Sequence, residues 1–333
     1  NLKNPVPKNK RTAEKTSDIE PVISLFDNNI NTNNAVSTQK DEPKNSEKSV
    51  SNEPVPEHKP SVNNISTATI KQPEEAPDNQ NFRIEDNNSV SGAKTKYRNN
   101  VNAIRILRTL ESENRNATQE EKKALSLYSG WGGLRYAFEG KDEKWQNEYK
   151  ELKELLTDDE YASASASTLD SFYTSNEIID SIYKVLDNLG FNGGDVLEPA
   201  MGVGNFFGRL PEKLQDSTNL YGVEKDSLSG RIATKLYPEA NIKVDGFEKT
   251  NFQDGSFDVA IGNIPFGDFS VNDSRYNAQN LKIHDYFFTK ALDKVRDGGV
   301  VAFVTSKGTL DKANPDVRKY IAQRADLLGA IRL

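Results

Sequence analysis

The stretch that decides the fold begins with DVLEPAMGVGNFFG at residues 195–208. It continues through YGVEKD at 221–226 and KVDGF at 243–247, and it closes with FDVAIGNIPFGDF at 257–269. Each piece contains the end of a short apolar run, which is typical of a buried strand. In the first piece a Gly-rich turn and the apolar start of a helix follow, as in the opening βα unit of an open α/β sheet. Ligands bind such sheets at the carboxyl ends of the strands, so this stretch predicts a binding site as well as a fold.

Carboxylates follow three of the expected strands. Glu198 follows the first, Glu224 the second and Asp245 the third. These charges would repel a phosphate, and the spacing G-x-G-x-x-x-G at 202–208 matches neither the dinucleotide fingerprint nor a P-loop. An acid after the second strand of such a sheet typically binds ribose hydroxyls. The three acids favour a ligand with a ribose, an amino group and positive charge, and S-adenosylmethionine (SAM) has all three. The alternative for each acid alone is a solvated loop residue.

The fourth piece ends in Asn263-Ile264-Pro265-Phe266 and indicates chemistry on a planar amine. The lone pair of an exocyclic base amine is delocalised into the ring, so the amine is a poor nucleophile until acceptors on its hydrogens localise that pair. The Asn263 carboxamide oxygen and the Ile264 carbonyl are candidates for these acceptors, and Phe266 is a candidate for stacking on an extruded base. The alternative is an ordinary turn, because Asn and Pro are common turn residues.

In this order the motifs resemble the amino-group DNA methyltransferases, specifically the adenine-N6 type in which the cofactor motif precedes the catalytic one. The resemblance covers residues 171–333. It implies a Rossmann-like α/β sheet with helices on both faces, SAM as the cofactor and adenine in DNA as the acceptor. The catalytic residues that it implies are Asn263, Ile264, Pro265 and Phe266. The cofactor-binding residues that it implies are Tyr173, Thr174, Glu198, Ala200, Gly202, Gly204, Asn205, Phe206, Glu224, Asp245, Gly246 and Phe247.

Three positions depart from the pattern of that family. Ser175 stands where the family has Pro in a Tyr/Phe-Thr-Pro segment beside the cofactor carboxylate, so only Tyr173 and Thr174 of that segment carry over. Ile264 stands where the family tetrapeptide has its first Pro, although Pro265 still favours an extended backbone at Ile264 and the carbonyl is retained. Gly246 separates Asp245 from Phe247, which leaves open which aromatic side chain packs on the cofactor.

Composition divides the chain into three parts. Residues 1–94 are rich in Asn, Pro, Ser, Glu and Lys with isolated apolar residues, which predicts a disordered tail or linker. Residues 95–170 predict a helical subdomain with a GWGG loop, and residues 171–333 predict the methyltransferase core. The expected helices cover 97–113, a segment that starts at Thr118, 144–161, a segment within 171–190 that Gly190 ends, 284–295 and 315–325. Ala/Ser repeats at 162–167 predict a flexible link, and 297–306 and 326–333 predict a turn with a buried strand and a further strand.

The segment SLYSGWGGL at 126–134 places Trp131 between glycines. One interpretation is a lid or a clamp on nucleic acid, and the alternative is that Trp131 packs the helical subdomain onto the core. Beside this core the segment resembles the large methylase–helicase proteins of bacterial conjugative elements and phages. We therefore expect a mobile-element protein with a possible helicase domain in the same polypeptide.

The composition also bounds the partners. The 333 residues include no Cys and two His, so we expect no disulfide and no metal site. No long apolar run or signal sequence is present, and this predicts a cytoplasmic protein without membrane contact. The chain does not begin with Met, so we expect a fragment whose last sheet strand and target-recognition domain lie downstream. Acidic residues outnumber basic ones in 171–333, and we therefore expect DNA binding to need those downstream domains.

Two other functions remain open. Methylation of RNA adenine or of a protein glutamine uses the same tetrapeptide geometry, because a glutamine amide has the same delocalised lone pair. The other class is a non-catalytic module that binds SAM or DNA for a helicase or a DNA-protection complex, which Ile264 and the acidic core favour.

Overall fold

The computed structural model describes residues 76–85, 92–169 and 174–332. Most of the predicted tail at 1–94, and the candidate site residue Tyr173, lie outside the described residues. Within the described ranges, no helix combines the length and the apolar character that a membrane span requires.

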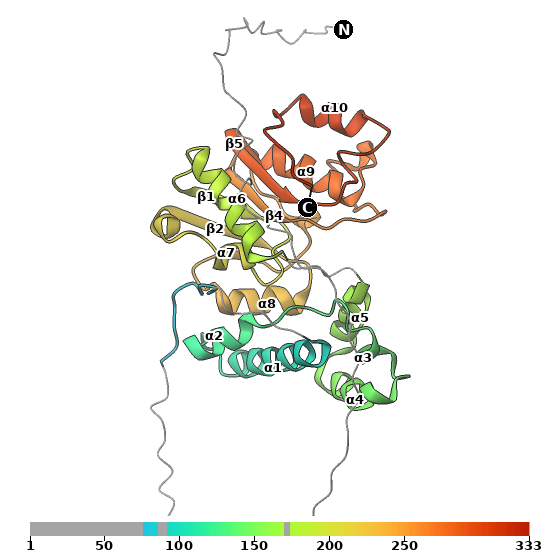
Figure 1. Ribbon diagram of the computed structural model, residues 1–333. Coiled ribbons are helices and arrows are strands. Elements are labelled where there is room, and N and C mark those ends of the chain that lie inside the picture. The colour runs from blue at the N-terminus through green and yellow to red at the C-terminus, as the bar shows by residue number, and fades with distance from the viewer. Residues whose placement is uncertain (1–75, 86–91, 170–173, 333) are drawn as a thin grey trace, which may run out of the picture. The chain divides into compact units, whose positions relative to one another are not determined.

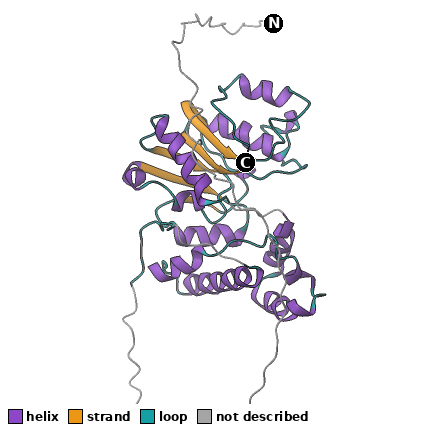
Figure 2. Ribbon diagram, viewed as in Figure 1, coloured by secondary structure: helices purple, strands orange, loops and turns teal. Residues whose placement is uncertain are grey.

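A five-stranded parallel sheet in the order β3-β2-β1-β4-β5 forms the centre of the fold (Figure 2). The chain moves outward from β1 to β3 and then crosses back to β4, so the strand order reverses between β1 and β4. This is the topological switch point at which open α/β sheets bind their ligands. The four predicted strands therefore lie side by side, as expected. The strands are β1 (Gly194–Glu198), β2 (Thr218–Val223), β3 (Asn241–Lys243), β4 (Phe257–Asn263) and β5 (Val295–Val304).

Helices cover both faces of the sheet, and the strands alternate between the two apolar layers. Val196 packs in a cluster with residues of α6, α7 and α8, whereas the next residue, Leu197, packs in a cluster with residues of α9. The family fold expected from the sequence is thus observed. The helices of this sheet region (residues 174–332) are α6 (Asn176–Asn188), α7 (Asn205–Gly208), α8 (Ser227–Leu236), α9 (Ile283–Lys294) and α10 (Asp316–Ala322).

A second group of helices forms the helical region (residues 93–169). Helices α1 and α2 contact α8 of the sheet region, and Figure 1 shows the three side by side. Arg231 of α8 pairs with Glu111 of α1 and with Glu160 of α5, so ion pairs join the two regions. The helices are α1 (Ala93–Ser112), α2 (Gln119–Ser126), α3 (Tyr136–Glu139), α4 (Gln146–Leu155) and α5 (Asp158–Ala166).

Two predictions for the helical region are wrong. The single helix expected over 144–161 is broken, because Thr157 and Glu160 form a capping box that begins a new helix. The flexible link expected at 162–167 is the second half of that helix, α5, and Ala164 is buried. Small residues here allow close packing, and tertiary contacts outweigh the weak local preference of Ser. The capping box at Thr118, which the sequence predicts, is present.

The segment 76–85 has neither helix nor strand but is firmly packed. The Phe82 N–H donates to the Leu236 carbonyl, and the Ile84 N–H donates to the Gly208 carbonyl, each at 2.9 Å. The buried ammonium of Lys122 on α2 donates to Asp78. The predicted tail therefore contains a short segment that joins the helical region to α7 and α8.

The strand expected at 326–333 is also wrong for the described residues 326–332, which form no strand. Leu327, Leu328 and Ile331 are exposed, so the apolar pattern has no neighbour to pair with or cover it. Within the described sheet β5 is consequently an edge strand, half-buried where a buried strand was expected.

Candidate active site

A cavity of about 390 Å³ opens at the carboxyl ends of β1, β2 and β4. Its volume lies in the range of cofactor and small-molecule sites. The predicted motifs meet here, although they are spread over residues 174–266 of the sequence. The predicted site residues that line it are Thr174, Glu198, Ala200, Gly202, Asn205, Phe206, Glu224, Gly246, Phe247, Asn263, Ile264, Pro265 and Phe266.

Glu198 is the last residue of β1 and its side chain is only 2% exposed. Its Oε2 atom has no hydrogen-bond partner among the described residues. Burial, with a contribution from the charge of Glu224, raises the pKa of Glu198 well above the ordinary glutamate value. A buried carboxylate without partners is unfavourable, so a ligand that brings N–H donors or positive charge would stabilise it.

Glu224 follows β2 and joins two turns. Its Oε2 accepts from the Gly202 N–H at 2.7 Å, and its Oε1 accepts from the Asp226 N–H at 2.7 Å. Burial raises the pKa of Glu224 to about 7, although these two hydrogen bonds oppose the rise. Each carboxylate oxygen retains acceptor capacity, which suits ligand hydroxyls.

The glycines of the turn after β1 have different roles. Gly202 (φ 56°) and Gly204 (φ 84°) both adopt the left-handed conformation that favours glycine. Gly202 lines the cavity and donates to Glu224. Gly204 lies outside the cavity lining, and a Cβ there would come within 2.5 Å of the Tyr237 ring. Gly204 therefore serves the packing of the turn in this structure.

The third motif is divided between the cavity and the surface. Asp245 does not line the cavity, and its carboxylate pairs with Lys249 at 2.9 Å. That pairing lowers the pKa of Asp245. Phe247 lines the cavity and is held by the rings of Tyr286 and Phe287. Gly246 left open which aromatic side chain of this motif packs on the cofactor. In the structure, Phe247 is the aromatic residue of the motif that lines the cavity.

The tetrapeptide begins at the last residue of β4. Asn263 pairs in register with Val304 of β5, and the Ile264 N–H donates to the Val304 carbonyl at 3.1 Å. Proline has no backbone N–H and cannot make this bond. The bond is therefore available to this chain because Ile264 stands where the family has proline. The Glu198 side chain lies against Gly262, since a Cβ on Gly262 would be 3.2 Å from Glu198 Cγ. The cofactor and catalytic motifs are thus in direct contact across β1 and β4.

Exposed aromatic rings mark the tetrapeptide side of the cavity. Phe266 is 37% exposed and Phe269 is 52% exposed, and both line the cavity. The Phe269 carbonyl accepts from the Ile283 N–H at 2.8 Å, which ties this part of the loop to the start of α9. The sequence analysis missed Phe269, although an aromatic residue three positions after the motif in a polar loop is a detectable signal.

Other lining residues were not predicted as site residues, although Lys225 and Asp226 belong to the YGVEKD motif and Trp131 belongs to the GWGG loop. The tertiary fold brings the segments together at the cavity. From the helical region these lining residues are Tyr128, Gly130, Trp131 and Ser167, and from the sheet region Lys225, Asp226, Ser229, Glu248, Val271, Ile283 and Phe287.

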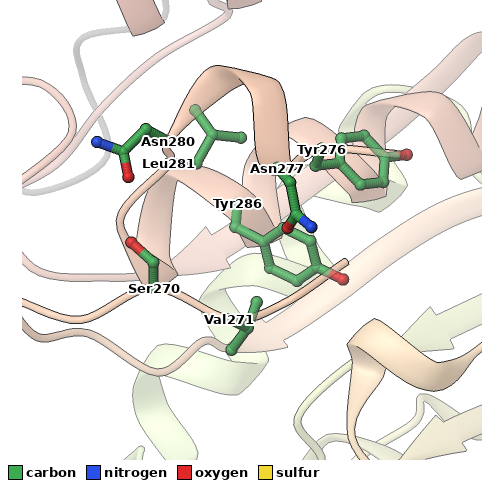
Figure 3. Close-up of a pocket in the computed structure, with 7 residues that line it drawn as sticks. All are labelled: Ser270, Val271, Tyr276, Asn277, Asn280, Leu281 and Tyr286. Carbon is green, nitrogen blue, oxygen red and sulfur yellow. The ribbon is translucent and has the colours of Figure 1, made fainter. Parts of the chain in front are cut away.

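A smaller cavity of about 120 Å³ lies beside the loop that precedes α9 (Figure 3). Its two tyrosine hydroxyls are engaged, because Tyr276 donates to Asp293 and Tyr286 donates to Asp273, each at 2.8 Å. The volume is below that of typical ligand sites. These contacts indicate a role in holding the loop, whereas the larger cavity is the candidate active site. Within the described residues, no cluster of three or more His, Asp or Glu could hold a metal ion.

The parallel sheet reverses its strand order between β1 and β4, and the cavity lies at that switch point. This is a Rossmann-like fold of the kind found in SAM-dependent methyltransferases. The sequence model of the N-6 DNA Methylase family matches residues 153–333, more than half of the chain. The chain therefore belongs to the N-6 DNA methylase family, and its matched part is a DNA methyltransferase domain. SAM is the methyl donor of such domains. Glu198, whose carboxylate has no partner among the described residues, and Glu224, which can still accept from hydroxyls, are suited to bind it.

The chain spans about a tenth to a third of the length of the curated relatives it matches. "Defense against restriction protein B" of Escherichia phage P1 is 26% identical over 239 residues, which cover 70% of this chain and 9% of that protein. The methylase subunit of the type I restriction enzyme MjaIX of Methanocaldococcus jannaschii is 32% identical over 126 residues, covering 34% of this chain and 21% of that protein. A solved structure from Listeria monocytogenes is assigned to the class I SAM-dependent methyltransferases. Its match covers 69% of this chain and 79% of the Listeria chain, with a TM-score of 0.41 and 14% sequence identity.

Proposed function

We propose that this chain transfers a methyl group from SAM to the exocyclic N6 amino group of adenine in DNA, as part of a larger mobile-element protein. The observation that carries the proposal is that Asn263 and the carboxylates Glu198 and Glu224 line one cavity. An amine acceptor and the methyl donor would therefore meet at the contact between β1 and β4.

Residues of β1 and β2 would hold the cofactor. The Glu224 carboxylate would accept from the ribose hydroxyls, and the unpartnered Glu198 carboxylate would accept from the ammonium group. Gly202 and Phe247 would contact the rest of the molecule, since both line the cavity. When bound, SAM supplies an electrophilic methyl group on its sulfonium sulfur.

Residues of β4 and the following loop would hold the adenine. The Asn263 carboxamide oxygen and the Ile264 carbonyl would accept from the two amine hydrogens, which localises the nitrogen lone pair. These acceptors also stabilise the positive charge that develops on the nitrogen, an effect largest in the transition state. Phe266, and Phe269 beside it, would stack on the extruded base. Pro265 would keep the tetrapeptide backbone extended.

The larger setting rests on the relatives. This chain matches only 9% and 21% of the first two relatives, so target recognition would depend on other parts of a longer polypeptide, with a helicase domain as one candidate. Acidic residues outnumber basic ones in 171–333, and this supports a DNA-binding footprint elsewhere in the protein. A cytoplasmic location follows if DNA of the host or the element is the substrate.

A second candidate is a non-catalytic module of a DNA-protection complex. The name of the phage P1 relative refers to defence against restriction, and the acidic balance of residues 171–333 favours a module that does not hold DNA by itself. Such a module would bind SAM without transferring its methyl group.

Product analysis separates these candidates. The protein is incubated with SAM labelled in the methyl group and, in parallel, with unmodified DNA, RNA and protein, and the products are hydrolysed and separated. We expect label in N6-methyladenine from DNA. Label in RNA adenine or in protein glutamine would show that RNA or protein, and not DNA, is the substrate. SAM binding without label in any acceptor would favour the non-catalytic module.

A further inference from the structure

The loop at residues 128–134 of the helical region forms part of the wall of the larger cavity. Tyr128, Gly130 and Trp131 line the cavity together with Glu198 and Thr174 of the sheet region. Residues 128–134 lie outside the part of the chain that matches the family model, which begins at residue 153. The family pattern therefore assigns them no role, although the fold brings them to the site.

The loop is held in one conformation from two sides. The fully buried Asn100 of α1 donates from its Nδ2 to the Gly130 carbonyl at 2.6 Å and accepts from the Ser129 N–H at 3.0 Å. On the other side, the Gly133 N–H donates to the Thr168 carbonyl at 3.0 Å. Lys96 donates to the Gly132 carbonyl at 2.8 Å. A wall fixed in this way is preorganised for a ligand.

Trp131 is fixed within the loop but has one unused polar group. Its side chain is 2% exposed and packs edge-to-face with Tyr97, Tyr128 and Phe138 at centroid distances of 6.4, 6.3 and 5.2 Å. The indole Nε1–H has no acceptor among the described residues. The indole nitrogen can only donate, and a buried donor without an acceptor is unfavourable.

Three polar groups of the cavity residues are buried without a partner among the described residues. Glu198 Oε2 can accept, the Trp131 Nε1–H can only donate, and the Thr174 hydroxyl can donate as well as accept. The carboxylate of SAM can only accept and carries negative charge, so it complements the donors. We propose that the Trp131 indole N–H donates a hydrogen bond to the carboxylate of the methyl donor, an inference that rests on the proposed use of SAM.

Binding of two related ligands to this chain tests the assignment. S-adenosylhomocysteine has the carboxylate, whereas 5′-methylthioadenosine has the same adenosine without the amino-acid part. Trp131→Phe retains an aromatic ring and removes the N–H. We expect S-adenosylhomocysteine to bind the variant about 10- to 100-fold more weakly, as for a lost bond to a charged acceptor, with 5′-methylthioadenosine unaffected.

The other tryptophan supplies the control. Trp145 packs on Tyr97 in the same aromatic cluster but does not line the cavity, so Trp145→Phe should leave both affinities unchanged. Equal S-adenosylhomocysteine binding by wild type and Trp131→Phe would overturn this inference alone. Equal weakening of both ligands would overturn the carboxylate as the acceptor. Wild type that binds neither ligand would overturn the use of SAM and the inference with it.

A measurement on the unmutated protein covers the case in which Trp131→Phe does not fold. The chain has two tryptophans and therefore two indole N–H signals in a ¹H–¹⁵N spectrum, which Trp145→Phe assigns. S-adenosylhomocysteine should shift the Trp131 signal downfield, and 5′-methylthioadenosine should not. A Trp131 signal that stays in place with S-adenosylhomocysteine bound would overturn the proposal.

Discussion

The two sides of the cavity are built differently. On the side of β1 and β2, Glu198 is buried and Glu224 joins two turns through backbone hydrogen bonds. On the side of β4, Phe266 and Phe269 expose about a third and a half of their surfaces. An enclosed, hydrogen-bonded wall suits a small ligand of constant structure, whereas open aromatic rings suit part of a macromolecule that must enter and leave. The difference fits the separate tasks that we propose for the two sides, and substitutions can test that separation.

The largest effect is expected for Asn263→Ala. Methyl transfer should fall about 100- to 1000-fold because an acceptor that acts mainly in the transition state is lost. SAM binding should stay nearly unchanged, since it belongs to the other side of the cavity. Turnover with labelled SAM and calorimetry measure the two quantities. Asn192→Ala, an exposed position just before the amino end of β1, is the matched control. Transfer at the wild-type rate by Asn263→Ala would show that the tetrapeptide is only a turn.

The next effect concerns the cofactor side. Glu224→Ala should weaken SAM binding by about 1.5–3 kcal/mol, the contribution of a hydrogen bond to a charged group. Glu224→Gln retains an acceptor for the Gly202 N–H and separates loss of the turn from loss of the ribose contact. Calorimetry gives the affinities, and Glu212→Ala at an exposed position is the control. Unchanged affinity in a folded Glu224→Ala protein would remove Glu224 from the ribose site.

The exposed aromatics should affect only the acceptor side. Phe266→Ala and Phe269→Ala should each weaken productive DNA binding by about 1–3 kcal/mol, as for loss of one stacked base. The apparent KM for DNA in methyl transfer measures this, with SAM affinity as the internal reference. Tyr136→Ala, an exposed ring on α3, controls for general loss of aromatic surface. A rise in the dissociation constant for SAM of the same size would contradict the division between the sides.

A smaller effect is expected from pH. Burial raises the pKa of Glu224 to about 7, so the ligand-free carboxyl group is mostly protonated at pH 6 and mostly ionised at pH 8. Ribose hydroxyls donate to the ionised form, and affinity for S-adenosylhomocysteine should therefore rise about tenfold over this interval. Glu224→Gln should flatten the dependence. Affinity that is constant or falls between pH 6 and 8 in the wild type would contradict this role.

The smallest effect is expected for Ile264→Pro. The sequence alone predicts that this change is tolerated, because it restores the family tetrapeptide. The structure predicts a cost of about 1 kcal/mol in the free energy of unfolding, since the bond from the Ile264 N–H to the Val304 carbonyl is lost. Ile264→Val, which keeps the N–H, is the control in thermal or denaturant unfolding. An unfolding free energy equal to that of the Val variant would favour the prediction from the sequence.

The features that could be predicted are those written locally in the chain. The ends of β1, β2 and β4 carry their polar residue beside an apolar run, and the capping box at Thr118 is a four-residue signal. Because parallel strands bring their carboxyl ends to one edge, the local patterns also predicted a shared site. Most of the predicted residues do line one cavity.

The features that could not be predicted depend on partners distant in the sequence. Asp245 is a different case, because it pairs with Lys249 only four residues away and does not line the cavity, and that local pair competes with the role the family pattern implies. Trp131 reaches the cavity through α1 and Asn100, so its neighbours follow only from the tertiary fold. The apolar residues within 326–332 indicate a strand, but a strand forms only where a neighbour offers hydrogen bonds.

Because Lys122 is buried against Asp78, the segment 76–85 belongs to the folded domain, and this affects where the domain begins. The Lys122 ammonium is fully buried, and Asp78 is the acid that neutralises it. A gene fusion or truncation that joined new sequence at α1 would keep every helix and strand that the structure describes but remove Asp78. It would leave the buried Lys122 ammonium without its acidic partner, at a cost of about 3–5 kcal/mol. That cost is comparable to the whole free energy of unfolding of a marginally stable domain. A recombination point compatible with the fold must therefore lie upstream of residue 78, before the end of a described segment (76–85) that has neither helix nor strand.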